Sequence, residues 1–259
     1  NQPVSPPDQM KCGGKVKYIS YKENISTLKK HITKKTKMII INNPNNPAGK
    51  IYSLKELNII FKTIKRSKIW LLVDEAYSDF ILNEKFISAG KLLTSKKNLI
   101  VVNSLSKNMG ISGWRIGYAI SNSYFIKQIL KLNQHIITCA PSILMIYLEK
   151  YFGNILKVTR PQIKSLLKKR DKVKLILNKY NLKYLTGTST FYFLVNIEKY
   201  KGSSTEFALK MLNKHRIAVV PGSAYGKSTK SFIRLGIGTE SLERIEQAIV
   251  LISKEILQN

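Results

Sequence analysis

The sequence predicts an α/β fold with a mostly parallel sheet, followed by a smaller α+β unit. Three continuous apolar runs, at residues 37–41, 69–73 and 98–103, are typical of strands covered on both faces of a parallel sheet. A helical pattern over residues 54–64 lies between the first two runs, and this alternation favours βαβ units. Beyond about residue 160 shorter strand patterns occur with two helical ones, which indicates the second, α+β unit.

The first part of the chain supplies the elements of the predicted sheet. Alternating apolar and polar residues at 15–20 predict a half-exposed strand. The first apolar run ends at the Asn- and Pro-rich segment 42–49, which is a strong turn signal. The helix over residues 54–64 has Ser53 as its N-cap with Glu56 close behind, which is typical of a helix start.

The middle of the chain is largely helical. Residues 123–132 predict one helix, and residues 142–179 predict another with interruptions at Gly153 and Pro161. We place the domain boundary in this second stretch, which gives a larger domain at residues 1–160 and a smaller one at residues 161–259. In the smaller domain, strands are predicted at residues 182–185, 190–195 and 217–220, and helices at residues 204–215 and 241–257.

Composition narrows the class of protein. The 259 residues are 44% hydrophobic, which fits a globular core, and no apolar run is long enough to cross a bilayer. Cys12 and Cys139 give neither a disulfide framework nor a metal-binding spacing, and the opening residues form no leader, so we expect a cytoplasmic protein without metal. The net charge of +29 comes from lysines spread over the whole chain, which indicates solvated surfaces and no specific nucleic-acid partner.

One stretch suggests a site for an anionic ligand. The apolar run at residues 98–103 is followed by Ser104, Ser106, Lys107 and, after two glycines, Arg115. Hydroxyl groups and backbone N–H groups bind phosphate oxygens, and an arginine adds a planar, charged fork. A solvated surface lysine is the alternative in so basic a chain, but the whole stretch favours a functional Lys107.

The segment at residues 104–117 resembles the cofactor-lysine signature of fold-type I enzymes that use pyridoxal 5′-phosphate (PLP), the class I and II aminotransferases. Two further segments support the resemblance. Residues 42–49 are similar to the family's Asn-Pro-x-Asn-Pro-Thr-Gly loop, with Ala48 in place of Thr, and residues 74–77 follow a predicted strand at its carboxyl end, where ligands gather. The resemblance implies a three-layer αβα large domain and a smaller α+β C-terminal domain.

The resemblance also implies a role for each motif residue. Lys107 would bind PLP covalently and move a proton during catalysis, and Asp74 would keep the pyridine nitrogen protonated so that the ring accepts electrons. Asn46 and Tyr77 would contact the phenolic oxygen of PLP. Ser104, Ser106 and Arg115 would bind its phosphate, and Arg234 would bind the substrate together with Asn46. Asp74 could instead only cap a helix.

Arg234 lies among apolar residues and glycines, where an unpaired charge is costly, so we expect an anionic partner. A structural salt bridge would satisfy this expectation. In the resembling family the arginine at this place binds the α-carboxylate of the substrate, and its fork matches a carboxylate in two hydrogen bonds.

The resemblance implies a homodimeric enzyme that transfers an amino group between an L-amino acid and a 2-keto acid. A PLP-dependent lyase, decarboxylase or cyclase on the same fold is the nearest alternative, because one cofactor supports many bond cleavages. An inactive partial protein and a basic nucleic-acid-binding module are more distant ones. The N-terminal elements of the family have no match, so we expect residues 1–259 alone to associate or aggregate, and the motifs do not identify the amino acid.

Overall fold

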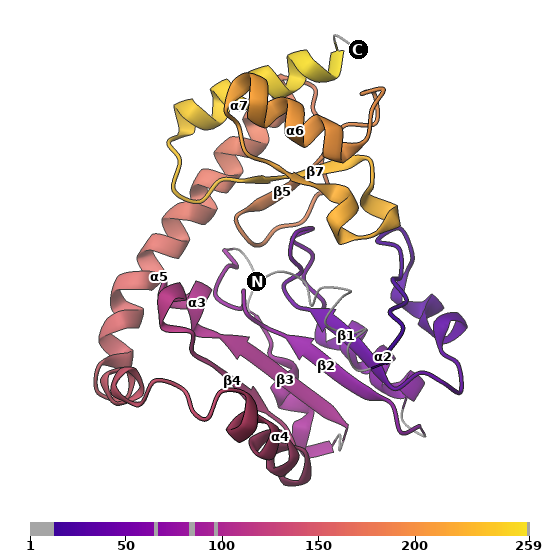
Figure 1. Ribbon diagram of the computed structural model, residues 1–259, viewed down its shortest axis with the longest axis vertical. Helices are drawn as coiled ribbons and strands as arrows, with labels where there is room; N and C mark the ends of the chain where they lie inside the picture. The colour runs from indigo at the N-terminus through magenta and orange to yellow at the C-terminus, as the bar shows by residue number, and fades with distance from the viewer. Residues whose placement is uncertain (1–12, 65–66, 83–85, 96–97, 258–259) are drawn as a thin grey trace.

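The computed structural model describes residues 13–64, 67–82, 86–95 and 98–257. A four-stranded sheet lies in the first part of the chain, and the predicted apolar runs form three of its strands (Figure 1). The strand order is β1 (Met38–Asn42), β2 (Trp70–Asp74), β3 (Leu99–Ser104) and β4 (Gly117–Ile120).

The sheet is mostly parallel, as predicted. Strands β1, β2 and β3 run parallel, whereas β4 pairs with β3 antiparallel. The chain returns from β3 to β4 through a short connection, the helix α3 (Leu105–Asn108) and the 3₁₀-helix η3 (Ser112–Trp114). Antiparallel neighbours can be joined by a short connection, so β3 and β4 need no crossover helix between them.

Helices lie on both faces of this sheet. On one face α2 (Leu54–Ile64) packs Leu57 and Ile60 into a core with Leu71 and other inward-facing strand residues. On the opposite face Trp70 contacts Phe125 of α4 (Ser123–Ile136), with ring centroids 4.7 Å apart. Two 3₁₀-helices, η1 (Ile25–His31) and η2 (Ala89–Ser95), complete this part.

The predicted start of α2 is confirmed in atomic detail. The Ser53 hydroxyl accepts from the Glu56 backbone N–H at 3.2 Å, and the Glu56 carboxylate accepts from the Ser53 backbone N–H at 2.8 Å. This reciprocal pair satisfies two backbone donors that the first turn of a helix leaves without partners.

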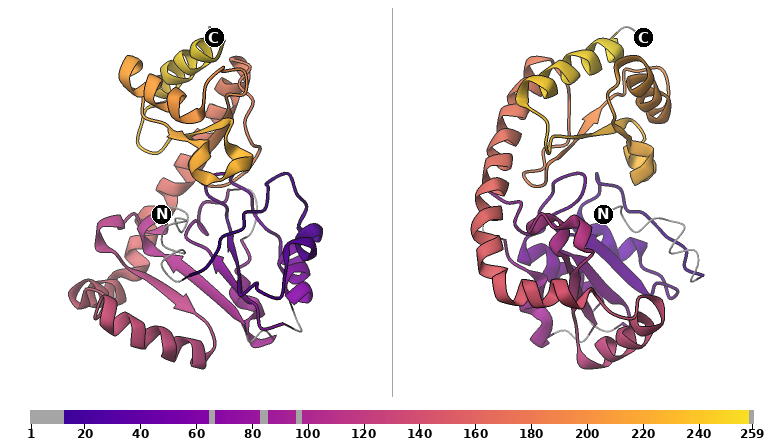
Figure 2. Two further views of the ribbon diagram at one scale, coloured as in Figure 1. Left: turned by 45° about the vertical axis from the view of Figure 1, so that its right-hand side comes forward. Right: turned by 60° about the vertical axis from the view of Figure 1, so that its left-hand side comes forward.

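The predicted interruptions at Gly153 and Pro161 are wrong, because α5 (Ser142–Lys179) runs without a break for 38 residues. A proline inside a helix removes one backbone hydrogen bond, but packing along the helix outweighs this loss. Leu148 packs near α3, and Val173 belongs to the core of the second sheet. Figures 1 and 2 show α5 passing along both sheets, so the boundary predicted near residue 160 falls inside a continuous helix and stays a prediction.

The C-terminal part is an antiparallel sheet covered by helices. Its strand order is β5 (Tyr192–Asn196), β7 (Phe232–Gly236) and β6 (Val220–Pro221), packed against α6 (Ser204–His215) and α7 (Leu242–Leu257). The 3₁₀-helices η4 (Gly222–Tyr225) and η5 (Lys227–Thr229) connect β6 to β7.

Three strand predictions fail wholly or in large part. The strand predicted at residues 217–220 is confirmed only at Val220, where β6 begins. Residues 15–20 adopt no strand and are mostly exposed, since no neighbouring strand of the described chain offers them backbone partners. The strand predicted at 182–185 is reduced to one bridge between Tyr184 and Val195. No helix within the described ranges has both the length and the apolar character needed to cross a membrane.

A shared carboxylate holds α6 against α7. Glu255 of α7 is buried and lies 2.6 Å from Lys210 Nζ, 2.7 Å from Lys214 Nζ and 2.8 Å from His215 Nε2. Hydrogen bonds from Lys210, then Lys214 and His215, lower the pKa of Glu255 to about 2. A carboxylate with a lowered pKa stabilises the fold above its unfolded pKa of 4.5 and loses this contribution as the pH falls from there towards 2.

We therefore expect Glu255→Gln to lower the free energy of unfolding at pH 7 by about 1–2 kcal/mol. The effect is smaller than for a fully buried ion pair because the lysine partners remain partly in water. The difference from the parent protein should shrink as the pH falls from 4.5 to 2. Chemical denaturation at several pH values measures both effects. Glu243→Gln, an exposed change on the same helix, is the control and should shift stability by less than about 0.5 kcal/mol.

Candidate active site at the carboxyl edge of the parallel sheet

The three parallel strands end at one edge of the sheet. In the strand register Asn42 lies opposite Asp74, and Asp74 lies opposite Val102, two residues before Ser104. Polar side chains that follow each strand are thereby brought to the same edge, which is where open α/β sheets bind their ligands. The register alone therefore gathers residues that are far apart in sequence.

Asp74 is a half-buried carboxylate at this edge. Its Oδ2 accepts from the Asn42 side-chain amide at 3.1 Å, and its Oδ1 accepts from the Ala76 backbone N–H at 3.0 Å. Burial raises the pKa of Asp74, and the bonds from Ala76 and Asn42 oppose that rise. Among the described residues no side-chain cation forms an ion pair with Asp74, so a cation placed beside it would relieve the cost of burying this charge.

The loop after β1 holds Asn46 in a buried position. The Asn43 side chain fixes the loop through Tyr52, accepting from its backbone N–H at 2.8 Å and donating to its carbonyl at 3.3 Å. A third bond, from Gly49 N–H to the Asn45 carbonyl at 2.8 Å, closes the turn. Asn46 is therefore part of a rigid loop beside Asp74's strand.

This loop, residues 43–49, docks onto the segment that leads into β5. The Gly49 carbonyl accepts three hydrogen bonds, from Thr188 N–H at 2.9 Å, Ser189 N–H at 3.2 Å and Ser189 Oγ at 3.0 Å. Gly49 has φ +70°, and a Cβ there would lie 2.7 Å from the Ser189 carbonyl oxygen. A Cβ on Gly187 would overlap the Ala48 carbonyl oxygen, so only glycines permit so close an approach.

An aromatic cluster joins the two sheets next to this edge. The Tyr77 hydroxyl lies 3.5 Å from the Tyr192 hydroxyl, and the Tyr77 ring contacts Phe80 and Phe191 edge to face. Lys107 Nζ lies 5.8 Å from the centre of the Phe191 ring. Burial, and then the bond with Tyr192, raises the pKa of Tyr77, so its hydroxyl keeps its proton at neutral pH.

Arg234 approaches the same cluster from β7. Its guanidinium carbon lies 4.3 Å from the centre of the Tyr192 ring and 5.5 Å from that of Tyr225. No carboxylate of the described chain pairs with Arg234, so the structural salt bridge considered from the sequence is not formed there. Stacking on the Tyr192 ring orients the fork, and the Tyr225 side chain accepts a hydrogen bond from Arg234.

The residues assigned to phosphate lie around α3. The Ser104 hydroxyl accepts from the Ser106 backbone N–H at 3.3 Å and caps this short helix. Arg115 is exposed, has φ 56°, and donates to the Ser112 carbonyl at 2.9 Å. Within the described ranges Arg115 forms no hydrogen bond with Ser104 or Ser106, so the structure places these three near one turn but not in contact.

Sequence reasoning missed Asn42 and Tyr192. Asn42 ends the first apolar run, and its bond to Asp74 follows from strand register, which a single sequence does not fix. Tyr192 begins β5, directly before three consecutive buried residues, and no motif around it marks it as a site residue. Its importance comes only from packing between Tyr77 and Arg234.

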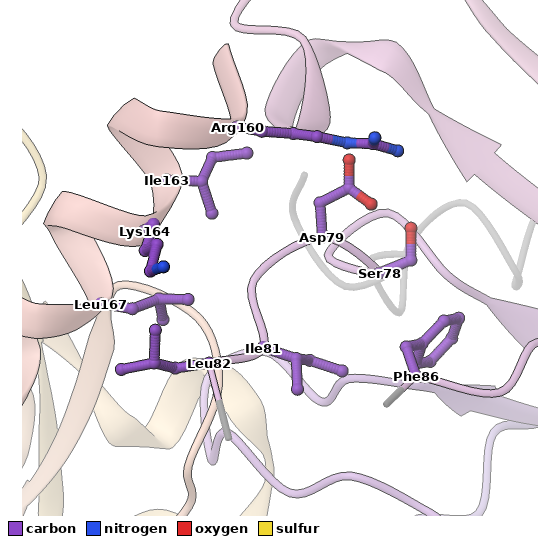
Figure 3. A pocket seen from close by; sticks show the side chains of 9 residues that line it. All are labelled: Ser78, Asp79, Ile81, Leu82, Phe86, Arg160, Ile163, Lys164 and Leu167. Carbon is purple, nitrogen blue, oxygen red and sulfur yellow. The ribbon is translucent and has the colours of Figure 1, made fainter. Parts of the chain in front are cut away.

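A separate hollow of about 350 Å³ lies between α5 and the loop after β2 (Figure 3). Asp79 lies in its wall with the Arg160 guanidinium beside it, and Ile163 and Leu167 supply apolar surface. Burial raises the pKa of Asp79, and the charge of Arg160 opposes that rise. None of the predicted site residues lines this hollow.

Comparison with known proteins gives a consistent result. The family model for aminotransferase class I and II matches residues 9–252. An aspartate aminotransferase of Pyrococcus abyssi is 31% identical over 247 residues, which covers 92% of this chain and 63% of that protein. An aspartate aminotransferase of Bacillus sp. strain YM-2 is 33% identical over 273 residues, which covers 97% of this chain and 67% of that protein.

The fold agrees with solved structures. The aromatic aminotransferase of Pyrococcus horikoshii superposes with a TM-score of 0.84 at 28% identity, over 92% of this chain and 64% of that one. The chain thus spans about three fifths of the length of such relatives. The predicted α/β fold and the family resemblance are both confirmed: the chain belongs to the class I and II aminotransferases.

Proposed function

We propose that the whole protein transfers an amino group between an L-amino acid and a 2-keto acid, with PLP held at the carboxyl edge of the parallel sheet. One observation carries the proposal. Lys107 of α3, which directly follows β3 of the first sheet, and Arg234 of β7 in the second sheet approach neighbouring members of one aromatic cluster, Phe191 and Tyr192. The names of the similar proteins, aspartate and aromatic aminotransferases, support this class of reaction.

The residues at the sheet edge fit PLP in chemical type. PLP has an anionic phosphate, a ring nitrogen, a phenolic oxygen and an aldehyde. The half-buried Asp74, which lacks a cationic partner among the described residues, matches a protonated ring nitrogen. The other assignments are Ser104, Ser106 and Arg115 for the phosphate, Asn46 and Tyr77 for the phenolic oxygen, and Lys107 for the aldehyde.

When bound, PLP would supply an electron-accepting ring that stabilises negative charge at the substrate Cα. Asp74 would hold a proton on the ring nitrogen, which gives the ring this capacity. Tyr77, whose hydroxyl keeps its proton, would donate to the phenolic oxygen together with the Asn46 amide. Lys107 would move a proton from the substrate Cα to the cofactor in the first half of the reaction and in the opposite direction in the second half.

Arg234 would bind the α-carboxylate shared by amino acids and 2-keto acids. Its fork matches a carboxylate in two parallel hydrogen bonds, and Tyr192 and Tyr225 fix its plane. Every amino acid and 2-keto acid carries this carboxylate, so the contact does not depend on the side chain of the substrate. Holding the carboxylate would orient the Cα–H bond for proton transfer.

We also propose that the protein works as a homodimer in the cytoplasm. Large apolar side chains are exposed on α4 and on the first half of α5, where a partner surface would cover them. They include Ile136 at 75% exposure, Ile143 at 80% and Ile146 at 65%. The exposed, unpaired thiol of Cys139 suits a reducing compartment.

The proposal is tested first at Lys107. The purified intact protein should bind PLP, absorb in the visible, and convert PLP to pyridoxamine phosphate when given one amino acid in the absence of a keto acid. Lys107→Ala should lose that absorption band and lose about 10²–10⁴-fold in rate, the range for removal of a positioned acid–base group. Lys62→Ala, an exposed change on α2, is the matched control. Carbon dioxide release or elimination without pyridoxamine phosphate would instead indicate a PLP enzyme of another reaction type.

The role of Arg234 is tested by Arg234→Lys, which keeps the charge but loses the fork. We expect KM for amino and keto acids to rise about 10- to 100-fold, the effect of losing about 1.4–2.8 kcal/mol of binding. PLP affinity should stay unchanged, and Arg244→Lys, an exposed change on α7, should alter neither quantity. A purely structural Arg234 would show itself as insoluble protein with no selective loss of substrate affinity.

Asp74→Asn should distinguish a role of Asp74 in catalysis from a role in holding the local turn. Removing the charge opposite the ring nitrogen should slow the Cα proton step by about 10²-fold or more, as when one preorganised charge contact is removed. If Asp74 served only to hold its turn, Asn would replace it with a loss of about 1 kcal/mol or less and normal half-reaction rates.

The same variant should behave differently in the cofactor-free protein. Because the pKa of Asp74 is raised above 3.8, the native state binds this proton more tightly than the unfolded chain does. Such a group stabilises the fold below its unfolded pKa and loses that contribution as the pH rises. The free energy of unfolding of Asp74→Asn should therefore increase relative to the parent from about pH 4 to pH 7. A difference that is constant over this range would show that burial does not raise this pKa.

A further inference from the structure

Arg170 of α5 is a buried cation that the proposed chemistry does not use. It is only 1% exposed, and its Nε and Nη1 have no hydrogen-bond partner among the described residues. Burial lowers the pKa of Arg170 to about 10, so the side chain remains charged at neutral pH. A charge buried without a carboxylate partner costs free energy, so its presence requires a physical reason.

The guanidinium of Arg170 lies against the loop that carries Asn46. A Cβ on Gly49 would stand 3.3 Å from Arg170 Nη2, so the guanidinium lies next to Gly49 and leaves little room for a side chain there. Gly49 is also the residue whose carbonyl accepts the three hydrogen bonds from Thr188 and Ser189. Arg170 therefore supports the point at which this loop is joined to the second sheet.

On its other side the same guanidinium contacts strand β5. Its carbon lies 4.3 Å from the centre of the Phe193 ring, and Nη2 makes a long contact of 3.5 Å with the Tyr192 carbonyl. Tyr192 in turn has its ring under Arg234 and its hydroxyl beside Tyr77. One side chain thus touches the backbone on the Asn46 side of the site and the backbone on the Arg234 side.

An apolar side chain of similar volume would fill this space without the cost of a buried charge. Only a planar guanidinium lies flat on a ring while directing N–H groups in its own plane towards carbonyl groups. The contact with Phe193 uses the flat face of the guanidinium, and the 3.5 Å contact of Nη2 with the Tyr192 carbonyl uses a donor in its plane. We therefore attribute the presence of an arginine at this position to the planar shape of its guanidinium and the directions of its N–H groups.

We propose that Arg170 is a positioning residue that sets the relative placement of the Asn46 loop and Tyr192, and so aligns the cofactor side of the site with the substrate side. The inference rests on the proposed function, since it assigns Arg170 an effect on PLP and substrate that it does not touch. A displaced loop would withdraw the Asn46 amide from the phenolic oxygen. A displaced Tyr192 would release the plane of Arg234.

The test compares Arg170→Lys and Arg170→Met in the intact protein with Arg160→Lys, an exposed change on the same helix. Three quantities are measured: PLP affinity by equilibrium dialysis, the apparent pKa of the visible absorption band by pH titration, and KM with kcat. Both Arg170 variants should bind PLP about tenfold more weakly, as small misplacements of a site produce. Their band should titrate at higher pH, because losing a donor to the phenolic oxygen disfavours its ionised form, and KM should rise. Arg160→Lys should match the parent.

Variants that are less stable but keep the parent's PLP affinity and band pKa would overturn the inference, because Arg170 would then only hold the fold together. If both Arg170 variants fail to fold, Ser189→Ala serves instead, since it removes one donor to the Gly49 carbonyl. It should move the band pKa in the same direction by a smaller amount, and an unmoved pKa would overturn the inference. A parent protein that binds no PLP would overturn the proposed function together with the inference, whereas normal parent binding with unmoved variants overturns the inference alone.

Discussion

The parallel register of β1, β2 and β3 is the constraint on which the site depends. Each strand pairs with its neighbour so that Asn42, Asp74 and the start of α3 arrive at one edge. Parallel strands need a long crossover connection between them, so their carboxyl ends, and the motifs that follow them, meet at the same edge. A slip of one residue in the register would turn Asp74 to the other face of the sheet and break its bond to Asn42.

A second contact joins this edge to the second sheet. The Gly49 carbonyl, with three donors from Thr188 and Ser189, fixes the loop after β1 to the entry of β5. Because β5 pairs with β7, this contact also determines where Arg234 stands relative to Tyr77. The proposed site residues therefore come from both parts of the chain, while the atoms that join the two parts at this contact are largely backbone atoms.

Local patterns in the sequence predicted most of the elements but not how they meet. The three apolar runs, the capped helix α2 and the helix α6 follow from periodicity and cap residues close together in the chain. The family motifs further predicted Asp74, Lys107 and Arg234 as site residues, which stays a prediction. The stacking of Arg234 on Tyr192 depends on packing between residues 42 positions apart, and no local pattern carries it. The unbroken course of α5 through Pro161 was missed for the same reason, because distant contacts outweigh a local helix breaker.

The unbroken α5 also restricts how the sequence of this protein can vary. Its N-terminal half packs near α3 and its C-terminal half enters the core of the second sheet. Inserting one residue between Leu148 and Val173 would rotate everything beyond it by about 100° around the helix axis and advance it by about 1.5 Å. Arg234 would then be carried away from Tyr77, however well both halves still folded. Insertions and deletions should accordingly be tolerated in the surface loops and excluded from this helix. The length of α5 sets the distance and the rotation between the two halves of the candidate site.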